Sequence, residues 1–548
     1  MNDTTPYEEG DPNSEICIVG EAPGHVEIRL SRPLVGPSGR LLERCLHAAG
    51  IARRECYLTN VFGEEVTKRH DGCSIVDSKG TELWHQNRGF TDTGVEKAEA
   101  CVRRLRTSKA NVFVPLGNTA LDLLCGTTGI TLQRGSVLPC TLLGMEGRKV
   151  LPTIHPAAVL RGQTIYHYVI TEDLRRVRVD SAFPELRLPE RNYRLRPTLE
   201  EALTYMQEAR HMDWIGFDIE TYARQVSCFG VAKSPTDTMC IPLVERGDPY
   251  WQEEEEVRIW EALAELLGDE KVGKIGQNLI FDIHFLLKEN SILTRGRLAD
   301  TMVAHSLMFP DLPKGLDFLA SVYTREPYYK DDRKMWNDPY ADPEKFWTYN
   351  AKDAAVTYEV WNELKEKLDK DGYQAMHDFT TRLYGPLCFM MLRGFKVDLS
   401  GLENTKKTIA QELEAKQVEL DTTAETPFNP ASPKQCLAYF YGTKGIAPYL
   451  NPKTKKPTVD DTALSRIWRK YRLKEARLVQ EIRKLQKLSG TYLEVVLDED
   501  NRLRSSYNPR GSRFGRLSSS QTIYKTGMNM QNLHPEFSKL LISDSDAN

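Results

Sequence analysis

The sequence predicts a multidomain α/β protein with a mainly helical C-terminal part. Short apolar runs alternate with helix-periodic segments over residues 15–180, and a second α/β pattern follows over residues 198–370. Helical patterns dominate from about residue 378 onward. A chain of 548 residues has room for three or four domains. We place three of them, at residues 1–180, 181–375 and 376–548.

The overall composition is that of an ordinary globular protein, with 40% hydrophobic and 27% charged residues. A net charge of −4 gives no global nucleic-acid signature, so contact with nucleic acid requires local basic surface. No apolar stretch is long enough to cross a bilayer, and the first residues are polar, so we expect no membrane contact and a cytoplasmic location. The 11 cysteines include no C-x-x-C pair, so we expect neither disulfides nor a zinc finger.

The first region predicts a doubly wound parallel sheet. Its strands are EICIVG, ECYLTNV, NVFVPLG and RKVLPTIH, and helical segments such as GRLLERCLHAAG and GNTALDLL follow them. Ligands bind beyond the carboxyl ends of such strands, which here present Glu21, Asn60, Gly117 and His155. Residues 64–95 are interpreted as a long irregular insertion.

The second region opens with the apolar strand WIGFDIETY, which contains two acids. Asp218 and Glu220 share a face because alternate side chains of a strand point the same way. Neighbouring carboxylates repel unless a cation lies between them or one is protonated. The pair is therefore a candidate metal site, and an exposed strand face with two acids is the alternative.

Two later stretches add further acids. KIGQNLIFDIHFLL predicts a strand that runs into a helix, with Asp282 near the helix start, where the dipole tolerates an acid. TYNAKDAAVTYEVW predicts a helix on which Tyr349 and Asp353, four residues apart, share a face. Four carboxylates and a tyrosine can thus converge.

The ordered motifs DIET, N-x-x-F-D and Y-x-x-x-D resemble those of the DnaQ-like DEDDy exonucleases, which have a ribonuclease H-like fold. ADTMVAHSLMF is similar to a segment of the proofreading domain of bacterial DNA polymerase I. The resemblance implies 3′–5′ exonuclease activity with Tyr349 orienting the attacking water. It also implies two divalent ions, Mg²⁺ or Mn²⁺, bound by Asp218, Glu220, Asp282 and Asp353. Two metals about 3.5–4 Å apart suit phosphodiester hydrolysis, and carboxylates suit such hard cations.

The third region predicts helices over residues 400–420, 432–441 and about 460–493. Four segments in order resemble the start and thumb of the polymerase region of family A DNA polymerases: RLYGPLCFMMLRGFKVD, FNPASPKQCLAYFYGTKGI, LQKLSGTYLEVV, and RFGRLSSSQ with MNMQNLHPE. Met391 and Leu392 replace the family's Met-Glu, and Phe514 replaces a threonine.

The polymerase resemblance implies a set of DNA contacts in this region. Arg516 is the principal candidate, and its proposed phosphate-binding neighbours are Arg513, Lys484 and Lys487. For each lysine, a solvated helix face is the alternative.

The sequence ends at LLISDSDAN, and DSDAN is interpreted as the approach to the first palm motif. The catalytic palm motifs of the family would lie beyond it. We therefore expect a truncated product or one part of a split enzyme whose second chain carries the palm and fingers. On this interpretation the chain alone does not polymerise.

The first region resembles family 4 uracil-DNA glycosylases over residues 15–165. The similar segments are GEAPGHVEIRLSRPLVGPSGRLLERCL, YLTNV, PLGNTAL and TIHPAAVLRG. The resemblance implies that Glu21 positions or activates water, Asn60 reads a flipped base, and His155 stabilises the departing uracil.

Several residues depart from the glycosylase pattern. Leu34 replaces the phenylalanine that stacks on uracil, which weakens stacking worth roughly 1–3 kcal/mol, and Ile28 replaces an aspartate. No C-x-x-C precedes Cys17, and only Cys101 falls near a cluster position, so we expect no iron–sulphur cluster. The domain is either an active glycosylase or a degenerate module that binds DNA, senses uracil or holds a partner.

Together these patterns predict a DNA replication or repair polymerase whose partner is DNA, both as primer-template and as single-stranded 3′ ends. A bacteriophage or bacterial source is an analogy from the fusion of domains. A free-standing exonuclease on DNA or RNA ends is the enzyme alternative, and a uracil-detecting or recruiting scaffold is the non-enzyme alternative.

Overall fold

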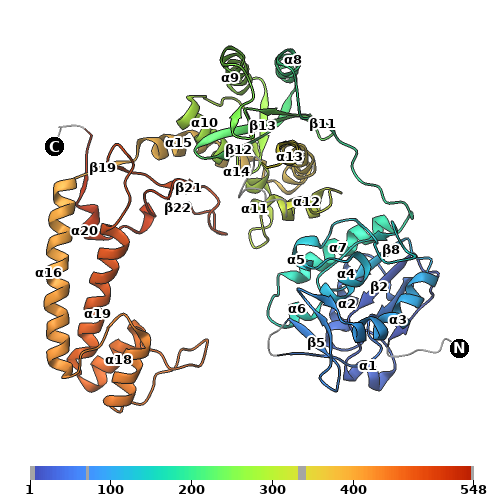
Figure 1. Cartoon of the computed structure of the whole chain (residues 1–548), viewed down its shortest axis with the longest axis horizontal. Helices are drawn as coiled ribbons and strands as arrows, with labels where there is room; N and C mark the ends of the chain where they lie inside the picture. The colour runs from blue at the N-terminus through green and yellow to red at the C-terminus, as the bar shows by residue number, and fades with distance from the viewer. Residues whose placement is uncertain (1–6, 70–72, 331–340, 545–548) are drawn as a thin grey trace. The chain divides into compact units, whose positions relative to one another are not determined.

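The computed structural model of the chain describes residues 7–69, 73–330 and 341–544 (Figure 1). It divides into two compact units, Met1–Arg382 and Leu383–Asn548. Residues 545–548, part of the stretch interpreted as the approach to a palm motif, lie outside the described residues. None of the described helices combines the length and the apolar character needed to span a bilayer.

The first sheet of unit 1 is doubly wound, as predicted. Its strand order is β1-β3-β2-β8-β10-β9, and the four inner strands are parallel. The two outer strands pair in the antiparallel sense. The strands are β1 Glu8–Glu9, β2 Ile16–Gly20, β3 Cys56–Asn60, β8 Val112–Pro115, β9 Leu138–Pro139 and β10 Lys149–Val150.

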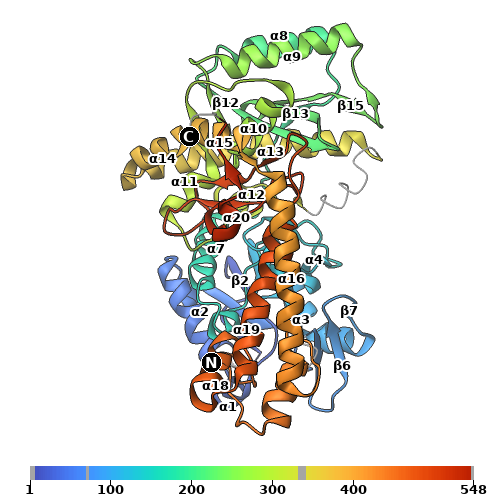
Figure 2. The same ribbon diagram turned by 90° about the vertical axis from the view of Figure 1, so that its left-hand side faces the viewer.

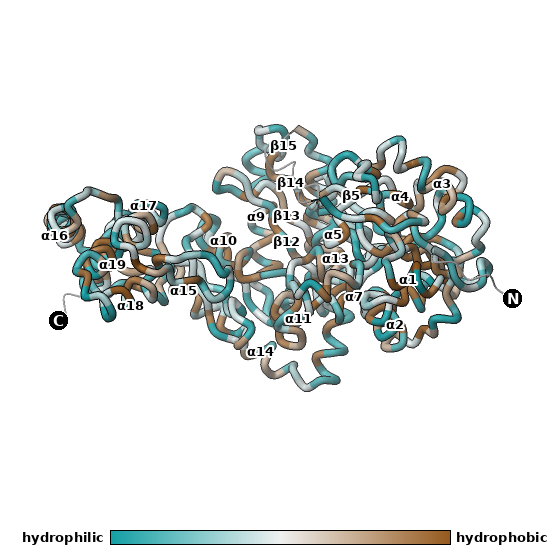
Figure 3. The backbone as a smooth tube through the Cα atoms, turned by 90° about the horizontal axis from the view of Figure 1, so that it is seen from below, coloured by the Kyte–Doolittle hydropathy of each residue, from teal (hydrophilic) through white to brown (hydrophobic). Residues whose placement is uncertain are grey.

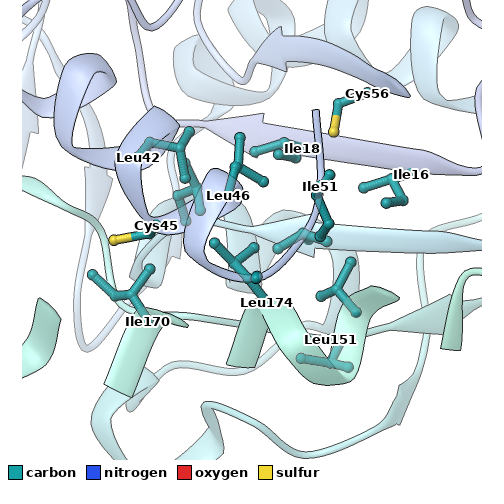
Figure 4. Packing of buried hydrophobic residues seen from close by; sticks show 14 of the residues in the cluster. Ile16, Ile18, Leu42, Cys45, Leu46, Ile51, Cys56, Leu151, Ile170 and Leu174 are labelled. Atoms are coloured by element: carbon teal, nitrogen blue, oxygen red, sulfur yellow. The ribbon is translucent and has the colours of Figure 1, made fainter. Parts of the chain in front are cut away.

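Both faces of this sheet are buried. Successive side chains of β2 point to opposite faces and belong to two different hydrophobic cores. Ile16 and Ile18 pack with residues of α2 and α7, as Figure 4 shows, whereas Cys17 and Val19 pack with residues of α3 and α4. Strands buried on both faces are typical of parallel sheets. The helices of this region are α1 His25–Leu30, α2 Pro37–Ala48, α3 Asp92–Thr107, α4 Asn118–Cys125, α5 Ile130–Gln133, α6 Ala157–Leu160 and α7 Tyr166–Asp180.

The prediction of an irregular insertion at residues 64–95 is wrong. This segment forms a four-stranded antiparallel sheet of β4 Thr67–Lys68, β5 Ser74–Val76, β6 Glu82–His85 and β7 Gly89–Phe90. Ile75 and Trp84 pair across it and are buried in the core. The strands are only two to four residues long, so turn residues dominate the sequence and conceal the pattern.

The second sheet of unit 1 has the order β11-β14-β13-β12-β17-β18. Strands β12, β13 and β14 are antiparallel, whereas β17 and β18 run parallel to β12. The strands are β11 Asn192–Arg194, β12 Trp214–Tyr222, β13 Gln225–Ser234, β14 Asp237–Pro242, β17 Gly273–Gly276 and β18 Leu298–Asp300, with a hairpin of β15 Val244–Glu245 and β16 Asp248–Pro249.

Helices cover both faces of the second sheet. Phe217 and Phe229 point to the face where Trp260 of α9 packs, and α13 crosses the opposite face. The helices are α8 Leu199–Ala209, α9 Glu253–Gly268, α10 Ile280–Asn290, α11 Thr301–Met308, α12 Leu316–Tyr323, α13 Pro343–Asp371 and α14 Gln374–Arg382.

Buried and partly buried polar contacts join the two α/β regions of unit 1. Arg134 forms an ion pair with Asp173 and donates to Ser321 Oγ at 2.6 Å. The backbone amide of Tyr328 donates to Ser136 Oγ at 3.2 Å. The two α/β regions therefore belong to one compact unit.

Unit 2 is mainly helical, as predicted, and Figure 2 shows α16 beside α19. Lys416 on α16 and Glu481 on α19 form an ion pair at 2.7 Å. Figure 3 shows the hydrophobic stretches of α18 and α19, whose buried residues share one core. The helices are α15 Tyr384–Arg393, α16 Leu399–Ala424, α17 Pro433–Leu437, α18 Asp461–Tyr471, α19 Lys474–Lys487 and α20 Pro535–Ser538, with π-helical turns at Ala438–Thr443 and Leu488–Leu493.

The prediction of one long helix over residues 460–493 is wrong, because this stretch is broken into two helices, α18 and α19. Arg472 has a φ of 55°, a left-handed conformation that ends α18, and α19 begins two residues later. Neither glycine nor proline marks this break, so the sequence pattern reads as continuous.

The described residues of unit 2 also form five short strands. β19 Phe395–Val397 lies between β20 Arg502–Leu503 and β23 Leu541–Ile542, and β21 Ser506–Asn508 pairs with β22 Ser518–Ser520. The amide of Tyr507 on β21 donates to the sulfur of Met391 at 3.3 Å, which ties the hairpin to α15.

Candidate functional site

Strand β12 presents Asp218 and Glu220 on the face that α13 covers. Asp218 lies opposite Gly230 of β13, and Glu220 lies opposite Cys228. A Cβ on Gly230 would lie 3.1 Å from the Asn350 carbonyl oxygen, and one on Gly216 would lie 2.7 Å from that of Ala354. The two glycines therefore permit α13 to approach the sheet closely.

This close approach brings a third acid to the pair. One carboxylate oxygen each from Asp218, Glu220 and Asp353 lies within 4.8 Å of the others. Glu220 and Asp353 are buried, whereas Asp218 is half-buried. Tyr349, one turn before Asp353 on α13, is also buried.

Asp282 lies next to this group rather than within its 4.8 Å limit. It is buried in the first turn of α10, and its Oδ1 accepts a hydrogen bond from the amide of Ile219 at 3.1 Å. Ile219 separates the two acids of β12 in sequence, so Asp282 approaches the strand between them.

Asn350 holds Asp218 and was not among the predicted site residues. Its Nδ2 donates to Asp218 Oδ2 at 2.9 Å and to the Asp218 carbonyl at 3.2 Å. The only sequence signal is its place three residues before Asp353, on the same side of the helix.

Burial and mutual repulsion disfavour the ionised forms of the carboxyl groups. Burial raises the pKa of Asp218 and of Glu220 well above the usual range, and the neighbouring carboxylates raise it further. Burial also raises the pKa of Asp282 to about 8. A cation at this position would favour the ionised forms.

Two more residues that the sequence did not indicate contact Asp353. Lys330 forms an ion pair with Asp353 Oδ2, and its Nζ donates to the Tyr349 hydroxyl at 2.7 Å. The hydroxyl of Tyr329 donates to Asp353 Oδ1 at 2.6 Å. Both residues precede α13, outside the three motifs, so no motif indicates them.

The four acids fit hard divalent cations. Asp218 and Glu220 of β12, Asp282 of α10 and Asp353 of α13 offer carboxylate oxygens, which Mg²⁺ and Mn²⁺ prefer over nitrogen or sulfur ligands. The crowding of buried negative charge is the physical condition that a bound cation relieves.

The carboxyl ends of the first sheet gather the residues of the second candidate site. Gly20 ends β2 opposite Asn60 of β3. A Cβ on Gly20 would lie 2.2 Å from Asn60 Oδ1 and 3.4 Å from Leu34 Cδ2. Glu21 follows Gly20, and its Oε2 accepts from Thr119 Oγ1 at 2.9 Å.

Asn60 and His155 differ in their hydrogen bonding. Asn60 is fully buried, and neither polar atom of its amide has a partner within the described chain. Nδ1 of His155 accepts from the amide of Ala157 at 3.2 Å, which places the proton of a neutral ring on Nε2. Burial lowers the pKa of His155, which favours that neutral ring, although Glu21 acts in the opposite direction.

The loop that carries Leu34 is held from two sides. Glu27 is buried, and its carboxylate accepts from the amides of Val35 at 3.1 Å and Gly36 at 2.7 Å. Arg53 donates to the Leu34 carbonyl at 3.0 Å. Leu34 is buried with a φ of 51°, a strained conformation for this residue.

Two other sequence features of this region have clear positions. Ile28, which replaces the family's aspartate, is 45% exposed. Cys17 and Cys101 are both buried in the same hydrophobic core. The absence of an iron–sulphur cluster stays a prediction.

The candidate DNA contacts of unit 2 lie on exposed surface. Arg513, Phe514 and Arg516 are exposed in the loop between β21 and β22, and Arg513 lies over the Phe514 ring at 4.7 Å from its centre. Lys484 and Lys487 are exposed in the last turn of α19.

Three family profiles match the chain in succession. The uracil DNA glycosylase superfamily matches residues 7–174, a 3′-5′ exonuclease family matches residues 196–369, and DNA polymerase family A matches residues 399–538.

Known proteins also match parts of the chain. The type-4 uracil-DNA glycosylase of Thermotoga maritima is 30% identical over 175 residues, which cover 31% of this chain and 79% of that protein. The DNA polymerase I of Rhizobium leguminosarum is 29% identical over 283 residues, which cover 50% of this chain. The matched part spans only 27% of that polymerase's length.

One solved structure is similar in fold. It is the POL domain of Pol1 from M. smegmatis in complex with DNA primer-template and dNTP, with a TM-score of 0.52 and 19% sequence identity. The likeness covers 64% of this chain and 57% of that chain, and at this identity it shows the fold alone.

The fold and the matches define a DNA polymerase I-like protein in which a glycosylase-like domain and a 3′-5′ exonuclease domain precede a polymerase segment. Through its first domain, the chain belongs to the type-4 uracil-DNA glycosylases of the uracil-DNA glycosylase superfamily.

Proposed function

We propose that residues 181–375 remove nucleotides from the 3′ ends of DNA in a metal-dependent reaction. The convergence of Asp218, Glu220 and Asp353 within 4.8 Å carries this proposal. These three residues and Asp282 would hold two divalent ions, Mg²⁺ or Mn²⁺. Residues 1–180 would form the glycosylase-like domain, and residues 376–548 the start and thumb of the polymerase region.

The residues of the chain have separable roles in this reaction. Tyr349 would orient the attacking water with its hydroxyl, and Asn350 fixes the Asp218 carboxylate at 2.9 Å. Bound ions would lower the pKa of that water and stabilise charge on the attacking and leaving oxygens. Burial excludes bulk water from the acids, which strengthens every charge interaction there.

The test uses the full chain and a 5′-labelled primer-template that contains one uracil. Wild type should give a ladder of shortened products in Mg²⁺ and none in EDTA. Asp218→Asn with Glu220→Gln should lower the rate by about 10³-fold or more, since metal catalysis is worth several kcal/mol.

The matched control is Glu261→Gln, which neutralises an exposed acid of α9 and should digest like wild type. An undiminished ladder from the double variant would refute the assignment.

A specific observation favours a second function, excision of uracil by residues 1–180. The buried amide of Asn60 has no partner within the described chain, and an amide of this kind can pair with the edge of a flipped base. The neutral ring of His155 would donate from Nε2 to the departing base, and Glu21 would position water. Base flipping is required because the target atom is inaccessible inside a duplex.

The same substrate tests this second function in EDTA followed by hot alkali. Wild type should break the strand at uracil, and Asn60→Ala should lower this activity about 100-fold, the usual effect of removing one buried hydrogen-bonding group at an active site. Asn87→Ala, an exposed residue that follows β6, is the control. An unbroken strand with an intact ladder would indicate a binding module without glycosylase activity.

The exonuclease and polymerase matches imply DNA as a partner. The proposed DNA is a primer-template, contacted in unit 2 by Arg516, Arg513, Lys484 and Lys487. A second chain that supplies the palm and fingers stays a prediction.

A further inference from the structure

Tyr329 and Lys330, which follow α12 in the chain, contact residues of the exonuclease site. Lys330 is only 8% exposed, and its ammonium group contacts both Asp353 Oδ2 and the Tyr349 hydroxyl. Nζ also lies 4.4 Å from the centre of the Tyr349 ring. The lysine is thus held by two residues of the third exonuclease motif.

The same segment occupies the other oxygen of Asp353. The Tyr329 hydroxyl donates to Oδ1 at 2.6 Å, while Lys330 pairs with Oδ2. A carboxylate that accepts two strong hydrogen bonds has fewer lone pairs to offer to a metal. Asp353 is therefore engaged by the chain itself.

Two ion pairs of Glu326 hold the segment that carries Tyr329 and Lys330. Glu326 pairs with Arg191 at 2.9 Å and with Lys352 at 2.9 Å. Lys352 directly precedes Asp353 on α13, so Lys330 and its target are anchored to the same helix.

The charge balance explains why a lysine lies here. Asp218, Glu220 and Asp353 crowd three carboxylates into a small volume, and such a group is unstable without positive charge. Lys330 is the cation that lowers the pKa of both Asp218 and Glu220, against the larger effect of burial. Its ammonium group supplies one positive charge where divalent ions would supply more.

We propose that Lys330 is the resident counter-cation of the exonuclease site and competes with divalent ions for Asp353, with Tyr329 as a weaker competitor. This inference rests on the proposed exonuclease function. Metal loading then requires Lys330 to leave Asp353, so the lysine sets the metal concentration at which the site is occupied.

The test titrates Mn²⁺ into the metal-free full chain at pH 8.5, where protons compete least, and follows free Mn²⁺ by electron paramagnetic resonance. Lys330→Met removes the charge and keeps the side-chain length, and it should bind Mn²⁺ about tenfold or more tightly than wild type. Tyr329→Phe should strengthen binding about threefold to tenfold, since it removes one hydrogen bond. Lys271→Met, at an exposed lysine, should match wild type.

The outcomes separate this inference from the exonuclease assignment. Unchanged or weaker Mn²⁺ binding by Lys330→Met would overturn the competition. The exonuclease site would still stand if Asp218→Asn with Glu220→Gln abolished Mn²⁺ binding. If neither wild type nor Lys330→Met bound Mn²⁺, the proposed function itself would be wrong. If Lys330→Met failed to fold, Lys330→Gln, which also removes the charge, decides: tighter Mn²⁺ binding than wild type supports the competition, and equal or weaker binding overturns it.

Discussion

At the scale of single residues, Asp282 connects protonation to metal binding. Its carboxyl has a pKa of about 8 in the folded chain, against 3.8 for an unperturbed aspartate, because it is buried. Between these pH values the folded protein holds a proton that the unfolded chain has lost. The contribution of Asp282 to the free energy of unfolding is therefore full below about pH 4 and decreases as the pH rises to about 8.

We predict that the metal-free chain in EDTA loses thermal stability between pH 6 and 8, and that Asp282→Asn reduces this loss. One group contributes at most about 1.4 kcal/mol per pH unit in this window. Since divalent ions need the ionised carboxylate, Mn²⁺ should also bind wild type more tightly as the pH rises. Thermal melts of both proteins at each pH provide the measurement, and identical pH dependence would contradict the role of Asp282.

Some residues of the site belong to a recognisable sequence motif, and others do not. Asp218, Glu220 and Asp353 could be predicted because acids inside apolar runs are costly and follow a known order. Lys330 and Asn350 could not, because a lysine or an asparagine beside a motif is ordinary in sequence. Their hydrogen bonds to Asp353 and Asp218 become visible only in the tertiary structure.

At the scale of elements, the β21–β22 loop exposes two arginines, Arg513 and Arg516. We predict that Arg516→Ala weakens primer-template binding and reduces the slope of log affinity against log salt by about one, as loss of one phosphate contact does. Arg513→Ala should act in the same direction.

Fluorescence anisotropy from about 50 to 300 mM KCl measures this slope, a range over which phosphate contacts lose most of their strength. Lys407→Ala, at an exposed lysine of α16, is the matched control and should keep the wild-type slope. A wild-type slope in Arg516→Ala would mean that this loop does not contact the backbone.

Helices and strands with a clear hydrophobic periodicity could be predicted from the sequence, and those without one could not. β12 and α13 have long, regular patterns, and the structure has both where the sequence places them. The β4–β7 sheet was missed because its strands are too short for alternation to emerge. The break at Arg472 was missed because a left-handed arginine has no signature in sequence.

At the scale of the whole molecule, the order of the three domain families could be predicted, but the grouping into two units could not. Arg134 and Ser321 make a buried contact across 187 positions of sequence. Tyr328 and Ser136 make a partly buried contact across 192 positions. Such contacts depend on tertiary packing and leave no local pattern, so the predicted boundaries at 180 and 375 stay predictions.

The close packing of α13 on β12 and β13 also limits which amino-acid substitutions the exonuclease site tolerates. Gly216 and Gly230 carry no chemical group, yet any side chain there would meet the backbone of α13. Substitution of either glycine would push apart the two elements that bring the acids together. A saturation mutagenesis screen for exonuclease activity would thus rank two inert residues alongside the carboxylates, and a search guided by reactive groups alone would overlook them.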